Sequence, residues 1–292
     1  MHTPVLVKEV LEYLEIKPSS RIIDATMNGG GHIKAILEKH HDVKVLGIEW
    51  DPMIFESLKS KLTDYEGRLI KVNDSYINLK NIVRDKDFEP NGVLFDLGLS
   101  SWHYENSGRG FSFKRDEILD MRFNPKDQTE SAADVVNKYT EDDLAEIMGS
   151  LGEESFAESI AKNIVRARQE KPIIMTSELV EVIRLSVPGW YKNQKIHFAT
   201  KTFQALRVKV NDELGNVKKG VKAAIEILKP GGRLVVISFQ GMEDKIVKDI
   251  FKEKIKMGII KMVMKGTVKP TWEEKKSNPR SRSAKMKIAE KL

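Results

Sequence analysis

The chain has 292 residues, with 49 Lys and Arg against 43 Asp and Glu and a formal net charge of +6. Hydrophobic residues make up 40% and charged residues 32%, as in a soluble globular protein of one large or two modest domains. The absence of cysteine excludes disulfides, thiolate nucleophiles and cysteine-ligated metal sites.

The first hundred residues alternate between apolar runs and helical patterns. In chain order they predict helix 4–15, strand 21–25, helix 32–40, strand 43–49, a helix opened by Asp51-Pro52, strand 68–72, helix 76–84 and strand 92–97. This alternation of strands and helices indicates a doubly wound, mainly parallel α/β sheet.

The alternation stops after the fourth strand. Residues 110–195 predict only helices, at 131–137, 140–149, 153–169 and 176–186. A long amphipathic pattern over 203–228, a fifth strand from Leu234 to Phe239 and helix 243–256 follow. The last forty residues predict one or two short strands and a tail. We therefore expect one sheet interrupted by an all-helical insertion.

The basic excess lies at the C-terminal end. Residues 252–292 hold 13 Lys and Arg and four acids, a charge of +9, so the preceding 251 residues carry −3. A basic tail of this kind favours a polyanionic partner, and a solubilising tail is the alternative.

Nothing in the sequence indicates a membrane protein. The N-terminus lacks a basic stretch followed by an apolar run, and apolar runs such as Leu234 to Phe239 are too short to cross a bilayer. We expect a cytoplasmic protein. No His, Asp and Glu cluster has metal-ligand spacing, so we expect no metal site.

A glycine loop joins the first strand to the next helix. It reads Asp24-Ala-Thr-Met-Asn-Gly-Gly-Gly-His32, and Glu49 and Asp96 end the second and fourth strands. Ligands of open α/β sheets bind at the carboxyl ends of the strands, so these polar groups predict a binding crevice there. A tight turn for the loop, and a helix cap or solvated loop for each acid, are the alternatives.

Two ligands suit such a crevice, a nicotinamide dinucleotide and S-adenosylmethionine. The dinucleotide fingerprint requires G-x-G-x-x-G, whereas these glycines are contiguous and follow a strand-end Asp. The pattern favours the methyl donor, which has no pyrophosphate to bind.

Blocks along nearly the whole chain resemble the ribosomal RNA small subunit methyltransferase H (MraW-like) family. Besides the glycine loop, they are His2-Thr-Pro-Val-Leu6, Asp96-Leu-Gly-Leu-Ser-Ser101, Arg109-Gly-Phe-Ser-Phe113, Leu119-Asp-Met-Arg122, Gly152-Glu-Glu154, Thr202-Phe-Gln-Ala-Leu-Arg207, Val210-Asn211, Pro230-Gly-Gly-Arg233, Val236-Ile-Ser-Phe239, Glu243-Asp244 and Asn278-Pro-Arg-Ser-Arg-Ser-Ala284.

The resemblance implies a class I S-adenosylmethionine-dependent methyltransferase that methylates the 4-amino group of a cytidine in 16S rRNA of the small ribosomal subunit. Its implied organisation is a methyltransferase domain over 1–108 and 200–292, interrupted by a helical, RNA-recognising insertion over 109–199. The implied contacts to the methyl donor are Gly30, Gly31, His32, Glu49, Tyr76, Asp96 and His103.

The chain departs from the family pattern at several positions. Asn28 stands where the family loop usually has Gly, Glu49 where it has Asp, and Trp102-His103 where it has Pro-Gln. The segments Gln240-Gly-Met242 and Phe198-Ala-Thr-Lys201 also differ from the usual residues. Since Asn tolerates left-handed backbone angles, we expect the loop turn to survive.

The proposed reaction needs an acceptor for a cytosine amine, whose lone pair is delocalised into the ring. We place this role in Asp96, Ser100 and Ser101 without choosing one general base; donor binding alone is the alternative role for Asp96. Alignment of the amine with the methyl group lowers the activation free energy, by roughly 7–11 kcal/mol in favourable cases, and so supplies much of the acceleration.

Arginines interleaved with aromatics predict RNA contacts. The candidates are Arg109, Arg115 and Arg122, near Phe111 and Phe113, and Arg280 and Arg282 at the C-terminal end. In the alternative reading, both Phe side chains lie in the core and the arginines pair with Asp116 and Asp120. Trp190 and Trp272 are expected to be packing residues.

Two other functions compete with the methyltransferase. A nicotinamide-dependent oxidoreductase would use a similar sheet, and a non-catalytic rRNA-binding assembly factor would retain the fold without the reaction. Asn28 and Gln240-Gly241 favour the second of these rivals.

Overall fold

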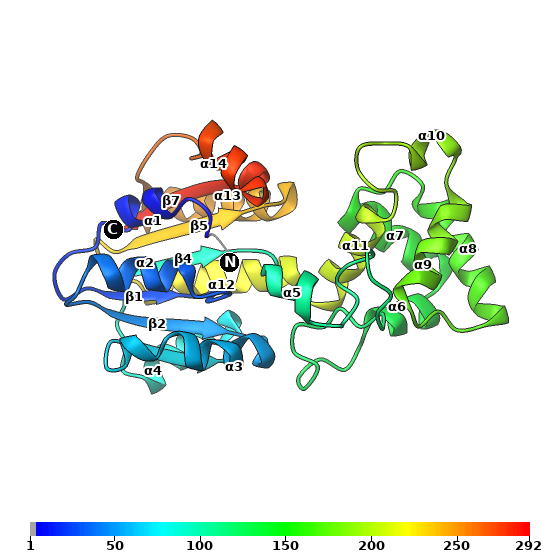
Figure 1. Ribbon diagram of the computed structural model, residues 1–292. Helices are drawn as coiled ribbons and strands as arrows, with labels where there is room; N and C mark the ends of the chain where they lie inside the picture. The colour runs from blue at the N-terminus through cyan, green and yellow to red at the C-terminus, as the bar shows by residue number, and fades with distance from the viewer. Residues whose placement is uncertain (1–3) are drawn as a thin grey trace. The chain divides into compact units, whose positions relative to one another are not determined.

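The computed structural model describes residues 4–292 and divides into two compact units. The sheet unit runs to Ser100 and resumes over Leu214–Leu292, and the helical unit is Ser101–Glu213. The expected α/β sheet with a helical insertion after the fourth strand is present (Figure 1). The insertion is longer than the expected 109–199, because α5 (Ser101–Asn106) and α11 (Thr200–Val210) group with the helices between them. His2 and Thr3 lie outside the described residues.

Within residues 4–292 the sheet has seven strands in the order β3-β2-β1-β4-β5-β7-β6. The strands through β5 are parallel, and β7 is antiparallel to both of its neighbours. Their bounds are β1 (Arg21–Asp24), β2 (Lys44–Glu49), β3 (Leu69–Asn73), β4 (Gly92–Asp96), β5 (Arg233–Ser238), β6 (Ile260–Met262) and β7 (Lys285–Lys291).

Helices cover both faces of the sheet (Figure 1). The described helices of this unit are α1 (Val7–Tyr13), α2 (Gly31–Lys39), α3 (Pro52–Lys61), α4 (Leu79–Asp85), α12 (Glu213–Ile227), α13 (Gly241–Lys256) and α14 (Trp272–Ser277). At the start of α3, the Asp51 side chain accepts from the N–H groups of Met53 (2.8 Å) and Ile54 (3.4 Å), and Pro52 follows. This cap confirms the predicted helix start.

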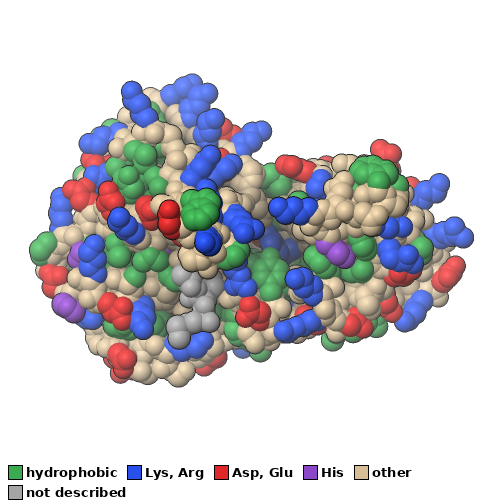
Figure 2. All heavy atoms as spheres, turned by 45° about the horizontal axis from the view of Figure 1, so that its top comes forward, with side chains coloured by type: hydrophobic (Ala, Val, Ile, Leu, Met, Phe, Trp, Pro, Cys, Tyr) green, Lys and Arg blue, Asp and Glu red, His purple; other side chains and the backbone are tan. Residues whose placement is uncertain are grey.

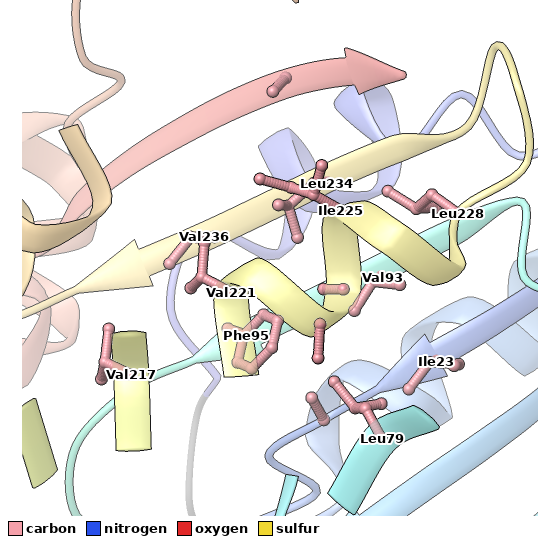
Figure 3. Close-up of a cluster of buried hydrophobic side chains, with 14 of the residues drawn as sticks. Ile23, Leu79, Val93, Phe95, Val217, Val221, Ile225, Leu228, Leu234 and Val236 are labelled. Atoms are coloured by element: carbon pink, nitrogen blue, oxygen red, sulfur yellow. The ribbon is translucent and has the colours of Figure 1, made fainter. Parts of the chain in front are cut away.

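One large apolar cluster fills the space between the sheet and the helices α4, α12 and α13. Ile23, Val93, Phe95, Leu234 and Val236 contribute from the strands, Val217, Val221 and Ile225 contribute from α12, and Leu228 directly follows that helix (Figure 3). On β2 the side chains alternate, so Leu46 and Ile48 join this cluster while Gly47 faces α2. A Cβ atom at Gly47 would lie 2.6 Å from Ile33 of α2. This close packing holds the carboxyl ends of β1, β2 and β4 in fixed register.

The helical unit is built from seven described helices, two of which begin with polar caps. Besides α5 and α11 they are α6 (Ala132–Lys138), α7 (Glu141–Gly152), α8 (Ala157–Glu170), α9 (Thr176–Ser186) and α10 (Gly189–Lys192). Reciprocal capping boxes open α6 (Ser131 with Asp134) and α7 (Thr140 with Asp143). A Cβ atom at Gly152 would lie 2.5 Å from the Lys201 carbonyl oxygen, so this glycine lets α7 and α11 approach closely.

Two predicted features are wrong. The amphipathic pattern over 203–228 is two helices, α11 and α12, because the chain turns at Asn211 and Asp212, where Asp212 has a φ of 44°. At the C-terminal end the expected short strands are confirmed as β6 and β7, but the expected tail is wrong, because α14, a 3-10 turn at Pro279–Ser283 and β7 continue the folded structure to Lys291. Lys and Arg side chains lie in several groups on the face of the molecule shown in Figure 2.

Candidate functional site

The glycine loop follows β1 and is tied to the ends of β2 and β4. The backbone N–H of Asn28 donates to Glu49 Oε2 (2.9 Å), and its side-chain amide donates to the Asp96 carbonyl (3.2 Å). Asn28 has a φ of 47°, so the left-handed turn expected despite the departure from glycine is present. Gly30, with a φ of 76°, directly precedes α2. The first N–H groups of that helix, which have no carbonyl partner within the helix, therefore lie next to the loop.

Two carboxylates and an imidazole are buried side by side at the strand ends. Asp24 is 1% exposed, His32 is 5% exposed and Asp96 is 6% exposed, and His32 Nε2 lies 3.5 Å from Asp96 Oδ2. Asp24 Oδ2, Asp96 Oδ1 and His32 Nδ1 have no hydrogen-bond partner among the described residues. Since a buried polar atom without a partner is costly, these three atoms indicate a place where a polar ligand binds.

Burial perturbs the ionisation of this cluster. It raises the pKa of Asp24 to about 6, although His32 and the Thr26 N–H oppose the rise. Burial also disfavours the charged form of His32, but the carboxylates of Asp96 and Asp24 outweigh this effect and raise its pKa. Such perturbed groups in one place are typical of functional sites.

Glu49 lies at the end of β2 with both carboxylate oxygens hydrogen-bonded. Oε2 accepts from the Asn28 N–H and Oε1 accepts from the Asp51 N–H, each at 2.9 Å. Burial nevertheless raises the pKa of Glu49 to about 8, because the two N–H bonds only partly compensate for desolvation. A ligand hydroxyl that donates to this side chain would favour its charged form.

Five of the predicted donor contacts therefore converge on the carboxyl ends of β1, β2 and β4. These residues are Gly30, Gly31, His32, Glu49 and Asp96. The Tyr76 ring instead packs edge-on against Phe95, with centroids 5.4 Å apart, and against Gly220 of α12. His103 belongs to the helical unit, where its ring contacts Phe111 and Phe123 at 4.9 and 5.1 Å.

The predicted acceptor segment crosses from one unit to the other. Ser100 is 3% exposed and ends the first part of the sheet unit, and Ser101 is half-buried at the start of α5. Between Asp96 and Ser100, Gly98 has a φ of 91°, a conformation that favours glycine.

Thr26 is a site residue that the sequence prediction missed. Its hydroxyl oxygen accepts from the Asp96 N–H at 2.6 Å, and its own N–H donates to Asp24 Oδ1 at 3.1 Å. Thr26 thus links Asp24 and Asp96 through these two hydrogen bonds. A polar side chain two residues after a strand-end Asp was the available signal.

The predicted RNA-binding arginines of the helical unit differ in their surroundings. Arg109 is 8% exposed and donates to the carbonyls of Arg122 (2.8 Å) and Phe123 (2.9 Å). Arg122 forms a two-point ion pair with Asp120 through its Nε (2.8 Å) and Nη2 (2.7 Å). Arg115 is exposed and donates to the Glu105 carbonyl.

The aromatic side chains agree completely neither with the predicted RNA contacts nor with the predicted packing in the core. Phe111 is 5% exposed and stacks on Phe123 at 5.7 Å, whereas Phe113 is half-buried. Trp190 and Trp272, expected to pack, are 63% and 68% exposed because each stands on a short surface helix.

Arg280 and Arg282 are exposed on the 3-10 turn at Pro279–Ser283, where Ser281 between them is buried. Lys287 of the same basic segment is 7% exposed and bonds to Asp244 and Thr267, so it supports the fold.

No group of three or more metal-ligating side chains occurs in the part of the chain that the structure describes. Among residues 4–292, none of the helices combines the length and apolar character needed to span a bilayer.

Comparisons with known proteins identify the family to which the chain belongs. The model of the MraW methylase family matches residues 1–292. The ribosomal RNA small subunit methyltransferase H of Persephonella marina is 41% identical over 292 residues, covering 100% of this chain and 99% of the relative. That of Elusimicrobium minutum is 43% identical over 294 residues, covering 100% and 98%. Among solved structures, an rRNA methylase from Streptococcus thermophilus aligns over 100% of this chain and 99% of its own, with 11% identity and a TM-score of 0.46.

Proposed function

The chain belongs to the MraW methylase family, and from that premise we propose that it transfers a methyl group from S-adenosylmethionine to the 4-amino group of a cytidine in 16S rRNA. It is a class I methyltransferase in fold and a methyltransferase in activity. The cluster of Asp24, His32, Glu49 and Asp96 at the strand ends is the observation that carries the proposal.

The buried groups fit the proposed methyl donor. Asp24 Oδ2 and Asp96 Oδ1 are acceptors without a hydrogen-bond partner among the described residues, and the donor carries hydroxyl and ammonium groups that can satisfy them. Its sulfonium and ammonium charges also suit a site with three carboxyl groups, whereas two phosphates of a dinucleotide would be repelled. Gly30, Gly31, His32 and Glu49 complete the donor site in this proposal, and Tyr76 and His103 remain predicted contacts.

Asp96 is the candidate that combines donor binding with catalysis. When bound, S-adenosylmethionine supplies an electrophilic methyl group and a neutral thioether leaving group. Asp96 Oδ1 would accept a hydrogen bond from the cytosine amine, so that electron density stays on nitrogen while the N–C bond forms and the S–C bond breaks. The surplus amine proton then leaves to water. Ser100 and Ser101 are the further candidates for orienting this amine.

The structure refines the proposed RNA contacts. Arg115, Arg280 and Arg282 are exposed and can reach phosphate. Arg109 and Arg122 are held by carbonyls and by Asp120, so we assign them to supporting the loop that carries them. The proposed partner is 16S rRNA in the small ribosomal subunit, and the proposed location is the cytoplasm.

The decisive experiment is methylation in vitro. Purified protein is incubated with methyl-labelled S-adenosylmethionine and with 16S rRNA or small subunits from cells that lack the enzyme, and the nucleosides are identified by mass spectrometry. We expect 4-methylcytidine; its absence from both substrates would favour the assembly-factor function. Thermal stabilisation by NAD(H) but not by S-adenosylmethionine would favour the oxidoreductase.

A further inference from the structure

A surface loop of the helical unit lies in a segment without acids. Residues 185–206 contain Lys192, Lys195 and Lys201 and no Asp or Glu. The loop between α10 and α11, residues 193–199, lies in the middle of this segment and is exposed over most of its length. Its local charge therefore suits a polyanion.

Two aromatic rings of this loop stack with a ring from a distant part of the sequence. His197 stacks on Phe113 with centroids 4.5 Å apart and planes inclined by 13°, and on Phe198 at 4.2 Å and 28°. Phe113 in turn packs edge-on against Phe203 of α11 at 5.5 Å. The group reaches solvent, because His197 is exposed and Phe113 and Phe198 are half-buried.

Hydrogen bonds hold the imidazole and the backbone of His197 in place. Its Nδ1 accepts from the Ala199 N–H at 3.2 Å, and the His197 carbonyl accepts from the Thr200 N–H at 2.9 Å. Partial burial lowers the pKa of His197, which favours the uncharged ring. The anchored His197 orders the three stacked rings, and this group presents a flat π-surface at little cost in conformational entropy.

The helical unit has a second exposed aromatic group that provides a contrast. Trp190 contacts Phe156 and Tyr191 edge-on, at 5.8 and 5.7 Å, and the Tyr191 hydroxyl donates to buried Glu154. Glu146, Glu154 and Glu158 line the same surface hollow as Phe156. Negative charge there disfavours phosphate, whereas the loop at 193–199 has only positive neighbours in sequence.

We propose that Phe113, His197 and Phe198 form a stacking platform for an unpaired nucleotide of the rRNA substrate, and that the exposed Lys195 contacts its phosphate. Unpaired bases stack on Phe and His rings, and the lysine supplies attraction that does not depend on sequence. The platform rests on the proposed function, since it assumes that RNA is the substrate.

The test compares two surface aromatic groups of the same unit. Binding of a fluorescently labelled single-stranded RNA is measured by anisotropy for His197→Ala, Phe198→Ala and the matched control Trp190→Ala. Loss of one stacking contact weakens binding by about 5- to 150-fold, so we expect at least a 5-fold increase in Kd for the first two variants and less than a 2-fold change for the control. His197→Phe keeps a flat ring and should restore the affinity if the platform alone matters.

Salt dependence separates the stacking residues from the phosphate contact. Lys195→Ala should reduce the slope of log K against log salt by about one, while His197→Ala should lower affinity without changing the slope. Calorimetric titration with S-adenosylmethionine should give the same Kd for all five variants, which verifies that the donor site is intact.

Several outcomes would overturn the platform. RNA affinity within 2-fold of wild type for both His197→Ala and Phe198→Ala would exclude it, as would equal losses in Trp190→Ala. Weaker binding to small subunits but not to protein-free rRNA would instead assign this face to a protein partner. The proposed function is tested by a different measurement, the methylation assay, and it is wrong if the wild-type protein forms no 4-methylcytidine on either substrate.

Discussion

Two clusters of buried polar groups, one in each unit, differ in how their atoms are hydrogen-bonded. In the sheet unit, Asp24, His32 and Asp96 each keep a buried polar atom that makes no hydrogen bond among the described residues. In the helical unit, Arg207 pairs with Glu213 through two bonds of 2.7 and 3.1 Å, and Glu154 accepts two contacts from the Tyr191 hydroxyl. The first arrangement leaves capacity for a ligand, and the second uses that capacity to hold helices together.

This difference has a physical reason. A buried charge is tolerated when another group compensates for its lost hydration, and that group is either part of the protein or arrives with a ligand. The partnered pairs of the helical unit therefore predict losses of stability on mutation. The groups without partners in the sheet unit predict losses of binding and catalysis.

The largest effect is expected at Arg207. Arg207→Ala leaves Glu213, whose side chain is 7% exposed, without its partner, and should lower the free energy of unfolding by about 3–5 kcal/mol. Arg184→Ala is the matched control, because Arg184 forms a similar two-point pair with Glu181 on the surface and should cost less than about 1 kcal/mol. Urea denaturation measures both; equal losses would contradict the structural role of the buried pair.

Asp96 is expected to affect activity more than stability. Asp96→Asn removes the charge of the proposed acceptor and should lower kcat/KM for methyl transfer by at least about 100-fold. Titration with S-adenosylmethionine, performed separately, distinguishes a catalytic role from donor binding. Asp42→Asn, on an exposed loop, serves as the control. Unchanged methyl transfer in Asp96→Asn would remove both proposed roles.

Glu49 should make donor binding dependent on pH. Its pKa is raised to about 8, and hydroxyl groups of the donor would stabilise the carboxylate and lower this pKa. Binding near pH 7 should therefore release a proton, and affinity should increase as the pH rises towards 8. Calorimetry in buffers with different ionisation enthalpies measures the release. Glu49→Gln should abolish it and weaken binding by about tenfold.

The same residue predicts how stability changes with pH. The folded protein keeps the Glu49 proton up to about pH 8, whereas the unfolded chain loses it near 4.5. The contribution of Glu49 to stability is thus complete below pH 4.5 and is lost as the pH rises to 8. The difference in unfolding free energy between wild type and Glu49→Gln should follow this trend, and a difference constant over that range would refute the raised pKa.

The smallest effect is expected at Asn28. Asn28→Gly relieves the cost of a φ of 47° but loses the hydrogen bond to the Asp96 carbonyl, so stability should change by less than about 1 kcal/mol. Gly30→Ala is the comparison, because a φ of 76° and a contact of 3.1 Å with Leu62 should cost about 1–2 kcal/mol. A larger loss in Asn28→Gly than in Gly30→Ala would show that the amide, and not the turn, holds the loop.

Local patterns predicted most of the sheet unit. Strand runs such as Val43 to Glu49 and the cap at Asp51-Pro52 depend on neighbouring residues, so their elements appear where expected. The glycine loop and the acids Glu49 and Asp96 were found in the same way, because strand ends in a parallel sheet meet at one edge.

Features that depend on contacts distant in sequence were not predictable. Strands were expected near the C-terminus, but the antiparallel insertion of β7 between β5 and β6, which pairs Lys285 with Ser238, depends on contacts far apart in sequence. The amphipathic pattern over 203–228 continues through Asn211, whose side chain bonds to the Met121 carbonyl in a loop far away in sequence.

By itself, the sequence determined the alternation of elements, the loop and acids of the proposed donor site, and the family of the chain. Only the tertiary structure decided which polar groups are satisfied. It shows that Arg109 supports a loop, that Glu49 has a raised pKa and that His197 stacks on Phe113, which stands 84 residues earlier in the chain. Hydrogen-bond partners and desolvation depend on atoms brought together in space, and local sequence patterns do not contain that information.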